Sequence, residues 1–408
     1  SKEMDMHHKN HNNNILKLIL AFLILLQFGS VIYSFYPILI DLTCFWLCTI
    51  ILLSDKKSYN KKLVYSIFII SSLLILIGLF TNNSSLKNNL NIIFRIAVSG
   101  MILWIFRINY RIYKNYISRA LKVIIYISFI NIILINSGVE KQFPSYTAEN
   151  GYYVRSLFFI FNSSTTAKLK GISFVRNPGI FWEPGILQIA GNLLFYLFFF
   201  EKIKSHLIDK IVTIIVILST FSTTGYIIMS IQILIYLIQN RKNRKYIILY
   251  VIFIMPIVLF NLMDKINNRN EYGSFYFRLY DINVGLKIIL NNPLLGIGYN
   301  FNSYLDSISS FNSIANSQVI RANSNSIIQL YVYFGLVIGS LFLFYLYKQK
   351  IFTYKKLVFI IILFSLMSEP LLFTYFIQIL FLSGTIDSSH ELNKSIHYRY
   401  KSEHYKYK

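Results

Sequence analysis

The chain alternates between long apolar runs and short polar segments that are rich in lysine and arginine. A helix that crosses a bilayer needs about 20 mostly apolar residues, and fewer where it ends inside protein. By this criterion the runs predict about twelve transmembrane helices. They cover approximately residues 15–34, 38–54, 63–80, 91–106, 121–137, 185–200, 211–222, 225–239, 246–262, 327–347, 357–368 and 371–384. We therefore expect an all-α polytopic membrane protein with a single membrane domain over residues 1–408.

Two pairs of these helices come from single apolar runs that are broken in the middle. The run 211–239 is interrupted by a Ser/Thr-rich segment at 219–225, and the run 357–384 is interrupted at Ser368, Glu369 and Pro370. Basic segments flank both runs, so the two ends of each run lie on one side of the membrane. Either two short helices or a re-entrant hairpin satisfies that condition.

The distribution of basic residues predicts the orientation, because cytoplasmic loops carry an excess of Lys and Arg. With the N-terminus in the cytoplasm, every short inside loop is basic, whereas the short outside loop 81–90 carries only Lys87. The inside residues are Lys56, Lys57, Lys61, Lys62, Arg107, Arg111, Lys114, Arg119, Lys122, Lys202, Lys204, Lys210, Arg241, Lys242, Arg244, Lys245, Lys348, Lys350, Lys355 and Lys356. Both termini are then cytoplasmic, with residues 385–408 as a cytoplasmic tail.

Composition supports a membrane protein and argues against a nucleic-acid-binding protein. The chain is 55% hydrophobic and 14% charged, far from the usual balance of soluble domains. Its net charge of +23 would suggest nucleic-acid binding in a soluble protein, but here the basic residues fall between apolar runs. We expect the lipid bilayer as the surroundings and no nucleic-acid partner. Cys44 and Cys48 lie one helical turn apart in one apolar run and are expected to be packing residues.

Two loops are long, and both fall on the outside, which makes them the places where chemistry is expected. The first is 138–184 and contains the apolar stretch Val154 to Phe161, which is too short to span the membrane. The second is 263–326, where Tyr276 to Leu290 could form an interfacial amphipathic helix.

The first long loop ends in Val175-Arg176-Asn177-Pro178-Gly179-Ile180-Phe181-Trp182-Glu183-Pro184-Gly185, directly before an apolar helix. Pro184 is at a position that favours proline in the first helical turn, and Glu183 is beside the helix N-terminus. Glu183 is therefore either a charged helix cap or a functional carboxylate. Arg176 suits a phosphate ligand, and Glu183 suits a base or an orienting group.

The second long loop adds further arginines and two glycines. Phe277-Arg278-Leu279 comes first, followed by Asn292-Pro293-Leu294-Leu295-Gly296-Ile297-Gly298-Tyr299, by Arg321, and by Asn323-Ser324-Asn325-Ser326 before the next helix. The glycines permit a tight turn, but without a preceding strand they do not indicate a nucleotide site. Each arginine could bind a phosphate ligand or merely contact lipid headgroups. Arg95 differs because it lies inside a predicted helix, and with Asp41 it is among the clearest membrane-embedded charges.

In these segments the sequence resembles the bacterial O-antigen polymerase and ligase superfamily of membrane glycosyltransferases. The resemblance covers about residues 170–340, and its strength lies in the order and placement of motifs that are individually weak. The motifs are Arg176–Gly179 with Phe181–Pro184, Ser222–Gly225, Phe277–Arg278, Asn292–Tyr299, Asn323–Leu330 and Phe334–Leu336.

The resemblance implies a type-C membrane glycosyltransferase-like fold in the bacterial inner membrane. It implies undecaprenyl-diphosphate-linked oligosaccharides as donor and acceptor at the periplasmic face, with no cofactor, nucleotide sugar or metal. Arginines of the family hold the donor diphosphate, which carries over here to Arg176 and Arg278. The acceptor base is left unidentified, and Glu183 is the candidate because it is the carboxylate of the matching loop motif. Arg321, Asn325, Tyr299 and Arg95 are further substrate-binding candidates. A chain-length regulator protein is a candidate partner.

One departure from the family is informative. Ligases of the superfamily have a histidine before an asparagine at the start of the helix that follows the second loop, and here Ser324 precedes Asn325. The histidines, at 7, 8, 11, 206, 390, 397 and 404, are all cytoplasmic on the predicted topology. We therefore expect a polymerase of O-antigen or capsular repeat units. The alternatives are an O-antigen ligase and a flippase for lipid-linked oligosaccharides.

Overall fold

The computed structural model describes residues 2–55, 61–80, 86–107, 109–147, 153–163, 166–169, 172–240, 274–311 and 323–386, together with 256 and 263. The protein is mostly helical, and helices correspond to the predicted apolar segments within these ranges. The predicted helix 246–262 lies outside the described residues, apart from one position. The predicted count of twelve is therefore not established.

The first half of the chain is built mainly from long helices. These are α1 (Lys2–Leu26), α2 (Val31–Phe35), α3 (Pro37–Asp55), α4 (Lys61–Phe80), α5 (Leu86–Phe106) and α6 (Tyr110–Asn136), followed by the 3₁₀ helix η1 (Val139–Gln142). The predicted segment 15–34 is divided between α1 and α2, because the backbone turns at Gly29, which has a φ of 115°.

The second half is built from shorter helices. These are α7 (Pro184–Phe199), α8 (Leu207–Ser219), α9 (Thr223–Gln239), α11 (Ser274–Asn291), α12 (Phe301–Phe311), α13 (Ser326–Tyr347), α14 (Lys355–Ser368) and α15 (Tyr375–Thr385). At 1.5 Å per residue, α8, α14 and α15 span about 16 to 21 Å, less than the ~30 Å hydrocarbon core. A re-entrant arrangement accommodates helices of this length.

Among the described residues, 5 helices are long and apolar enough to cross a membrane. They are α3, α4, α5, α6 and α13, and shorter apolar helices occur at Asn13–Leu26, Pro184–Phe199, Thr223–Gln239 and Tyr375–Thr385. This pattern is that of a multi-pass membrane protein.

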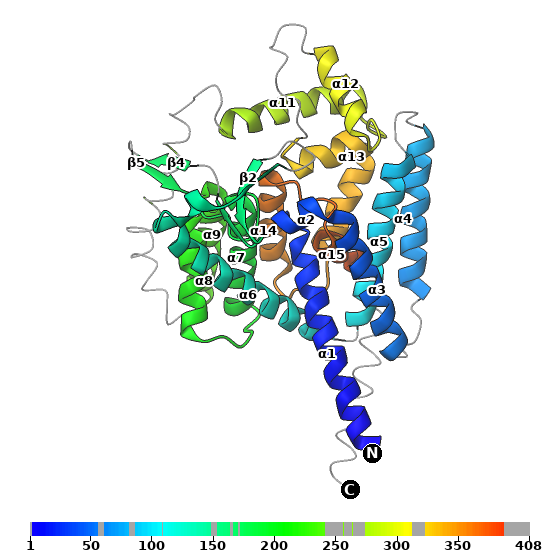
Figure 1. The fold of residues 1–408 in the computed structure, drawn as a ribbon. Helices are drawn as coiled ribbons and strands as arrows, with labels where there is room; N and C mark the ends of the chain where they lie inside the picture. Colours follow the sequence, from blue (N-terminus) through cyan, green and yellow to red (C-terminus); the bar gives the residue numbers. More distant parts are fainter. Residues whose placement is uncertain are drawn as a thin grey trace.

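The two long loops lie together at one end of the molecule. Figure 1 shows α11 and α12 of the second loop at the end opposite the start of α1, with the strands of the first loop toward the same end. The second loop contains the predicted helix, since α11 spans Ser274–Asn291 and so includes the stretch Tyr276 to Leu290.

The first long loop contains β-structure that the all-α prediction did not include, and for this loop the prediction was wrong. Its strands are β1 (Ser145–Thr147), β2 (Tyr153–Leu157), β3 (Phe161–Ser163), β4 (Thr166–Leu169) and β5 (Ile172–Val175). All pairs are antiparallel, with β1 next to β2, β2 next to β3, and β4 next to β5. Short strands with alternating exposure pair locally, so hydropathy alone does not reveal them.

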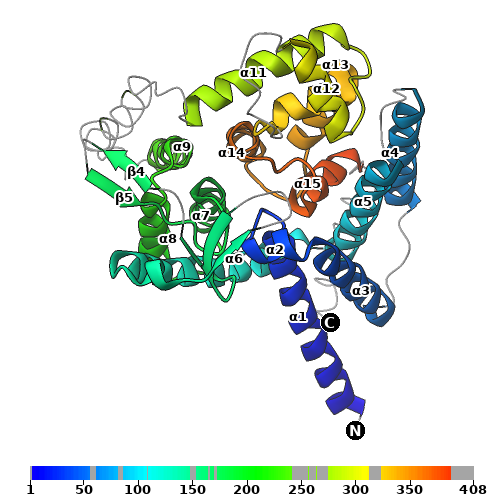
Figure 2. The same cartoon turned by 45° about the horizontal axis from the view of Figure 1, so that its top comes forward.

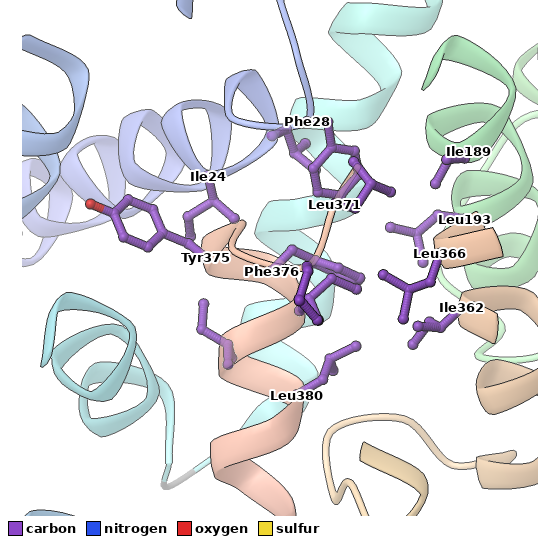
Figure 3. Packing of buried hydrophobic residues seen from close by; sticks show 14 of the residues in the cluster. Ile24, Phe28, Ile189, Leu193, Ile362, Leu366, Leu371, Tyr375, Phe376 and Leu380 are labelled. Carbon is purple, nitrogen blue, oxygen red and sulfur yellow. The ribbon is translucent and has the colours of Figure 1, made fainter. Parts of the chain in front are cut away.

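The C-terminal helices form the centre of the helical core. In both views α14 and α15 lie between α7–α9 on one side and α4–α5 on the other (Figures 1 and 2). Figure 3 shows side chains of α1, α7, α14 and α15 meeting there, including Ile24, Leu193, Leu366 and Leu380. Phe28 and Phe376 meet edge to face with ring centroids 5.5 Å apart. Cys44 and Cys48 are buried free thiols, which agrees with their predicted packing role.

The Gly296–Gly298 turn fixes the second long loop to α13. The Ile297 amide donates to the Val332 carbonyl at 2.9 Å, and the Gly298 amide donates to the Tyr333 carbonyl at 3.1 Å. Helix α13 is kinked at Gly335, whose φ is 72°. A Cβ at Gly335 would overlap the Leu294 backbone, so glycine is required there for close contact. The contact between the second long loop and α13 therefore explains the glycines at 296, 298 and 335.

Candidate functional site

Buried asparagines fix the segment that carries Arg176. The Asn177 side chain donates to the Ser128 carbonyl and to Ser219 Oγ, each at 3.0 Å, while its Oδ1 accepts from Asn131 at 2.9 Å. Asn162 adds a bond from its Nδ2 to the Gly179 carbonyl at 3.0 Å. Groups from α6, from β3 and from the last residue of α8 therefore hold this turn in one conformation.

Arg176 itself extends to the connection between α8 and α9. Its Nε donates to the Thr220 carbonyl at 2.9 Å. Beyond this residue the Ser222 hydroxyl caps α9 by accepting from the Gly225 amide at 3.4 Å. The Ser/Thr-rich segment between α8 and α9 thus supplies a hydrogen-bond acceptor for Arg176. The guanidinium group makes this bond through Nε, and its two terminal nitrogens are not part of it.

Glu183 is the N-cap residue of α7, and Pro184 starts the helix as the sequence predicts. The Glu183 side chain makes no capping hydrogen bond, so as a cap it would act through its charge beside the helix N-terminus. Its carboxyl group instead forms a hydrogen bond with the carboxyl of Glu369. Gly185 makes room for this contact, because a Cβ at that position would overlap Glu369 Oε1.

Glu369 lies in the connection between α14 and α15, and it is 3% exposed. Ser326, the first residue of α13, holds this connection by two hydrogen bonds. Its hydroxyl donates to the Glu369 carbonyl at 2.7 Å and accepts from the Leu371 amide at 2.8 Å. The start of α13 therefore places the second carboxylate against the start of α7.

Arg278 reaches the same place from α11. Its Nη2 donates to the Ser368 carbonyl at 3.4 Å, next to Glu369. Asp281, one helical turn further along α11, accepts from both the Ser324 amide at 3.0 Å and the Ser324 hydroxyl at 2.7 Å. This clamp joins α11 to the segment before α13 and so positions Arg278.

These four residues, Arg176, Glu183, Arg278 and Glu369, interact electrostatically and are called the charge cluster below. Burial and the neighbouring Glu183 raise the pKa of Glu369 well above its ordinary value, although both arginines oppose the shift. Burial lowers the pKa of Arg176, while the two carboxylates counteract the lowering. Because an arginine remains charged at neutral pH, the cluster has two fixed cations beside Glu183 and the buried carboxyl group of Glu369.

This arrangement has a definite chemical capacity. Two guanidinium groups offer forked donors to the oxygens of a phosphate or diphosphate. A carboxyl group whose pKa is raised, as that of Glu369 is, is a candidate for taking or giving a proton. Within the described ranges, no three His, Cys, Asp or Glu side chains are grouped so that they could hold a metal ion.

Among the other predicted substrate-binding residues, Asn325 and Tyr299 have structural contacts and Arg321 is not described. Asn325 caps α13, with its Oδ1 accepting from the amides of Ile327 at 3.0 Å and Ile328 at 3.1 Å. Tyr299 packs edge to face on Phe373, with ring centroids 4.7 Å apart. Arg321 lies outside the described residues. Substrate-binding roles for these residues stay predictions.

Arg95 belongs to a second polar cluster, on the other side of the same connection. Its Nε donates to Asp41 Oδ2 at 3.2 Å, and its Nη2 donates to the Tyr33 hydroxyl at 2.6 Å. Gln27 donates to Asp41 at 2.5 Å and accepts from the Tyr375 amide at 2.8 Å. The chain of bonds ends at the start of α15, so Arg95 helps to fix the connection that carries Glu369.

The sequence pattern singled out Glu369 only as a break in an apolar run. A stronger interpretation was available, because a carboxylate between two apolar helices is costly unless it has partners or a function. What the sequence could not give was its partner: Glu183 precedes α7 and Glu369 follows α14.

Comparison with known families gives one finding. Residues 210–343 match the sequence model of the O-antigen ligase family. The match agrees with the resemblance to the O-antigen polymerase and ligase superfamily and supports a function of that type in polysaccharide assembly. It includes α8, α9 and α11–α13, and therefore Arg278, whereas Arg176, Glu183 and Glu369 lie outside the matched residues. No curated protein matches the chain.

Proposed function

We propose that this protein is a membrane glycosyltransferase that polymerises oligosaccharide repeat units carried on undecaprenyl diphosphate. The observation that carries the proposal is the charge cluster, in which Arg176 and Arg278 interact with the carboxyl pair of Glu183 and Glu369. Both arginines and one of the carboxylates come from the long loops, at the end of the molecule opposite the start of α1 (Figure 1). On the predicted topology this end faces the periplasm.

The arginines would stabilise the leaving group. Transfer breaks the bond between the anomeric carbon of the donor sugar and the diphosphate oxygen, and the electron pair goes to that oxygen. Negative charge then develops on the departing polyprenyl diphosphate. Two guanidinium groups fixed by the Thr220 and Ser368 carbonyls are preorganised to receive that charge.

The carboxyl pair would manage the proton. The acceptor hydroxyl forms the new bond to the anomeric carbon and must lose its proton to a base. Glu183 is our candidate for this base, since it is the more exposed of the two carboxylates and borders the arginines. Glu369, with its raised pKa, would hold the proton that the pair shares and keep Glu183 in position.

Polymerase is favoured over ligase by the residue at position 324. Ligases of the superfamily carry a histidine there, taken to activate the acceptor hydroxyl, whereas this chain has Ser324 bound to Asp281. A serine engaged in a structural clamp is a poor candidate for that role. The second candidate function remains an O-antigen ligase, which the description of the matching family favours.

A flippase is the less supported alternative. Transport would need charged residues along a central path, but the embedded Arg95 and Asp41 are paired with each other at 3.2 Å. Asp41 also binds Gln27, and Arg95 also binds Tyr33. This second polar cluster is therefore a fixed structural element.

Deletion of the gene in the native host tests these three functions together. Loss of a polymerase should reduce the surface glycolipid to core plus a single repeat unit, because translocation and ligation continue. Loss of a ligase would leave bare core and full-length glycan on the carrier. Loss of a flippase would leave bare core and single lipid-linked units on the cytoplasmic side. Bare core would contradict the polymerase proposal.

In a host that makes capsule without ligation to lipid A, the purified protein provides the corresponding test. Synthetic lipid-linked repeat units should be converted into a ladder of longer products without added nucleotide sugar. A preparation that binds these units but forms no ladder would contradict the proposal.

A further inference from the structure

A cavity lies far from the charge cluster, at the opposite end of α7. It has a volume of about 540 Å³. Glu183 precedes the first residue of α7 and Lys202 follows its last turn, so the 16-residue helix separates the two sites by about 24 Å. On the predicted topology this end faces the cytoplasm.

Three lysines and no carboxylates line this cavity, which is called the lysine cavity below. Its described lining is Phe198, Phe199, Lys202, Ile203, Lys204, Ser205, Lys210, Tyr236, Gln239, Asn240 and Tyr354. Lys202 and Lys204 are exposed and Lys210 is half-buried, so the three like charges give the cavity a positive potential that favours an anion. The amide and hydroxyl groups of the lining supply further hydrogen-bond donors.

The carboxylates near the lysine cavity, Glu201 and Asp209, bind residues other than its three lysines. Glu201 binds Lys114 at 2.6 Å, the Tyr196 hydroxyl at 2.8 Å and the Thr353 amide at 2.6 Å. These bonds lower the pKa of Glu201 against the effect of its burial, so it remains ionised.

Asp209 is engaged in the same way. It binds Lys122 at 2.9 Å and the Tyr126 hydroxyl at 2.7 Å. Within the described residues, no carboxylate forms an ion pair with Lys202, Lys204 or Lys210.

The segment that carries Lys202 and Lys204 is held in place although it is not helical, and Lys210 lies on α8. The Ile203 amide donates to the Leu197 carbonyl at 3.1 Å, and Lys202 has a φ of 53°, a left-handed conformation that is uncommon for lysine. Anchoring of Glu201 to Thr353 fixes the start of the segment. A strained, anchored backbone beside cations that form no ion pair within the described residues indicates a formed site rather than a flexible basic loop.

Aromatic rings form the wall of the cavity. Tyr236 packs edge to face on Phe199 with centroids 5.2 Å apart, and Lys210 Nζ lies 5.1 Å from the centroid of the Phe199 ring. Lysines and tyrosines at the ends of apolar helices are the residues that meet lipid headgroups at a membrane surface.

We propose that the lysine cavity binds a phosphate-bearing anion. Two sources share this chemistry: the headgroup of an anionic phospholipid in the surrounding leaflet, and a soluble phosphate compound. Basic pockets between helices on the cytoplasmic side are known to accept anionic headgroups. The site is independent of the charge cluster, so it stands whether or not the glycosyltransferase proposal is correct.

The test uses the full chain in detergent micelles. The background protein carries Arg176→Gln and Arg278→Gln, so that phosphate bound at the charge cluster does not contribute. The cavity variant adds Lys202→Gln, Lys204→Gln and Lys210→Gln, and the control variant instead adds Lys61→Gln, Lys62→Gln and Lys348→Gln, which removes the same charge outside the cavity. One arm counts retained phosphatidylglycerol and phosphatidylcholine by native mass spectrometry. The other arm measures inorganic phosphate binding by calorimetry.

The cavity variant should lose phosphatidylglycerol affinity by about a hundredfold, while the control variant changes by less than about threefold. That result supports the site with a lipid as its ligand. Selective loss of inorganic phosphate binding instead supports the site with a soluble ligand. Equal losses in the two variants, or no binding of either probe to the background protein, would overturn the proposal.

Discussion

The carboxyl groups of Glu183 and Glu369 are hydrogen-bonded to each other, although one residue precedes α7 and the other follows α14. Two carboxyl groups can share a hydrogen bond only when at least one is protonated. Burial and the neighbouring Glu183 raise the pKa of Glu369, which favours its neutral form and leaves more of the positive charge of Arg176 and Arg278 available to an anionic substrate. The predictions below follow from this cluster and from the predicted topology.

The first prediction concerns the carboxyl pair. Glu183→Gln and Glu369→Gln should each reduce polymer formation by about a hundredfold or more, because glutamine preserves the size of the side chain and removes proton transfer. Ladder formation from lipid-linked repeat units measures the effect. Glu140→Gln is the matched control, because Glu140 is a buried carboxylate of the first long loop outside the charge cluster. Full activity in the Glu183 variant would remove it as the base.

A second prediction uses the space beside Glu369. A Cβ at Gly185 would overlap Glu369 Oε1, so Gly185→Ala should displace that carboxyl group and lower activity by about tenfold or more. In a Glu369→Ala background the same change should cost nothing further, because the overlap no longer exists. Ladder assays on the four proteins of this cycle measure the coupling. Additive losses would show that Gly185 acts by another route.

The arginines are tested by substitution and partial rescue. Arg176→Ala and Arg278→Ala should each abolish polymer while the protein inserts and accumulates normally. Lysine should restore little, because it retains the charge but lacks the forked donors. Arg155→Ala provides the control, since Arg155 is an exposed arginine on β2 of the first long loop. An active Ala variant would reassign that arginine to surface contact.

A further prediction concerns pH. The pKa of Glu369 is raised above the ordinary 4.5, so the folded protein binds this proton more tightly than the unfolded chain does. The resulting stabilisation is complete below the ordinary pKa and is lost as pH rises through the folded pKa.

The thermal unfolding midpoint should therefore fall with rising pH more steeply in the parent protein than in Glu369→Gln. Unfolding in detergent from about pH 5 to about pH 9 measures the difference. Identical profiles for the two proteins would show that Glu369 is not protonated in the folded state.

The last prediction is topological. A reporter fused near Ser145 or Asn302 should be periplasmic, because both positions belong to the long loops. Reporters near Asn60, Asn243 or Ser388 should be cytoplasmic, since basic segments surround these positions. Enzymatic reporters active on only one side of the membrane distinguish the outcomes. A cytoplasmic signal at Asn302 would remove both the predicted orientation and the proposed site.

Local pattern by itself determined most of the helices. Apolar length and helix punctuation placed α3, α7 and α13 to within a few residues of their observed bounds, since burial in lipid or inside the protein requires a mostly apolar helix. Pro184 at the start of α7 and the helix within the second long loop were also determined by local signals. The β-strands of the first loop escaped detection, because short strands have no long apolar signature.

Only the tertiary structure decided which polar residues meet. The sequence nominated Arg176, Glu183 and Arg278 separately, and their interaction with Glu369 depends on α14 packing between α9, α7 and α13. The tertiary structure also shows that Arg95 pairs with Asp41 and is not part of the charge cluster. A hydropathy pattern records how much of a segment is buried, whereas the partner of a buried charge is fixed by contacts between helices far apart in the chain.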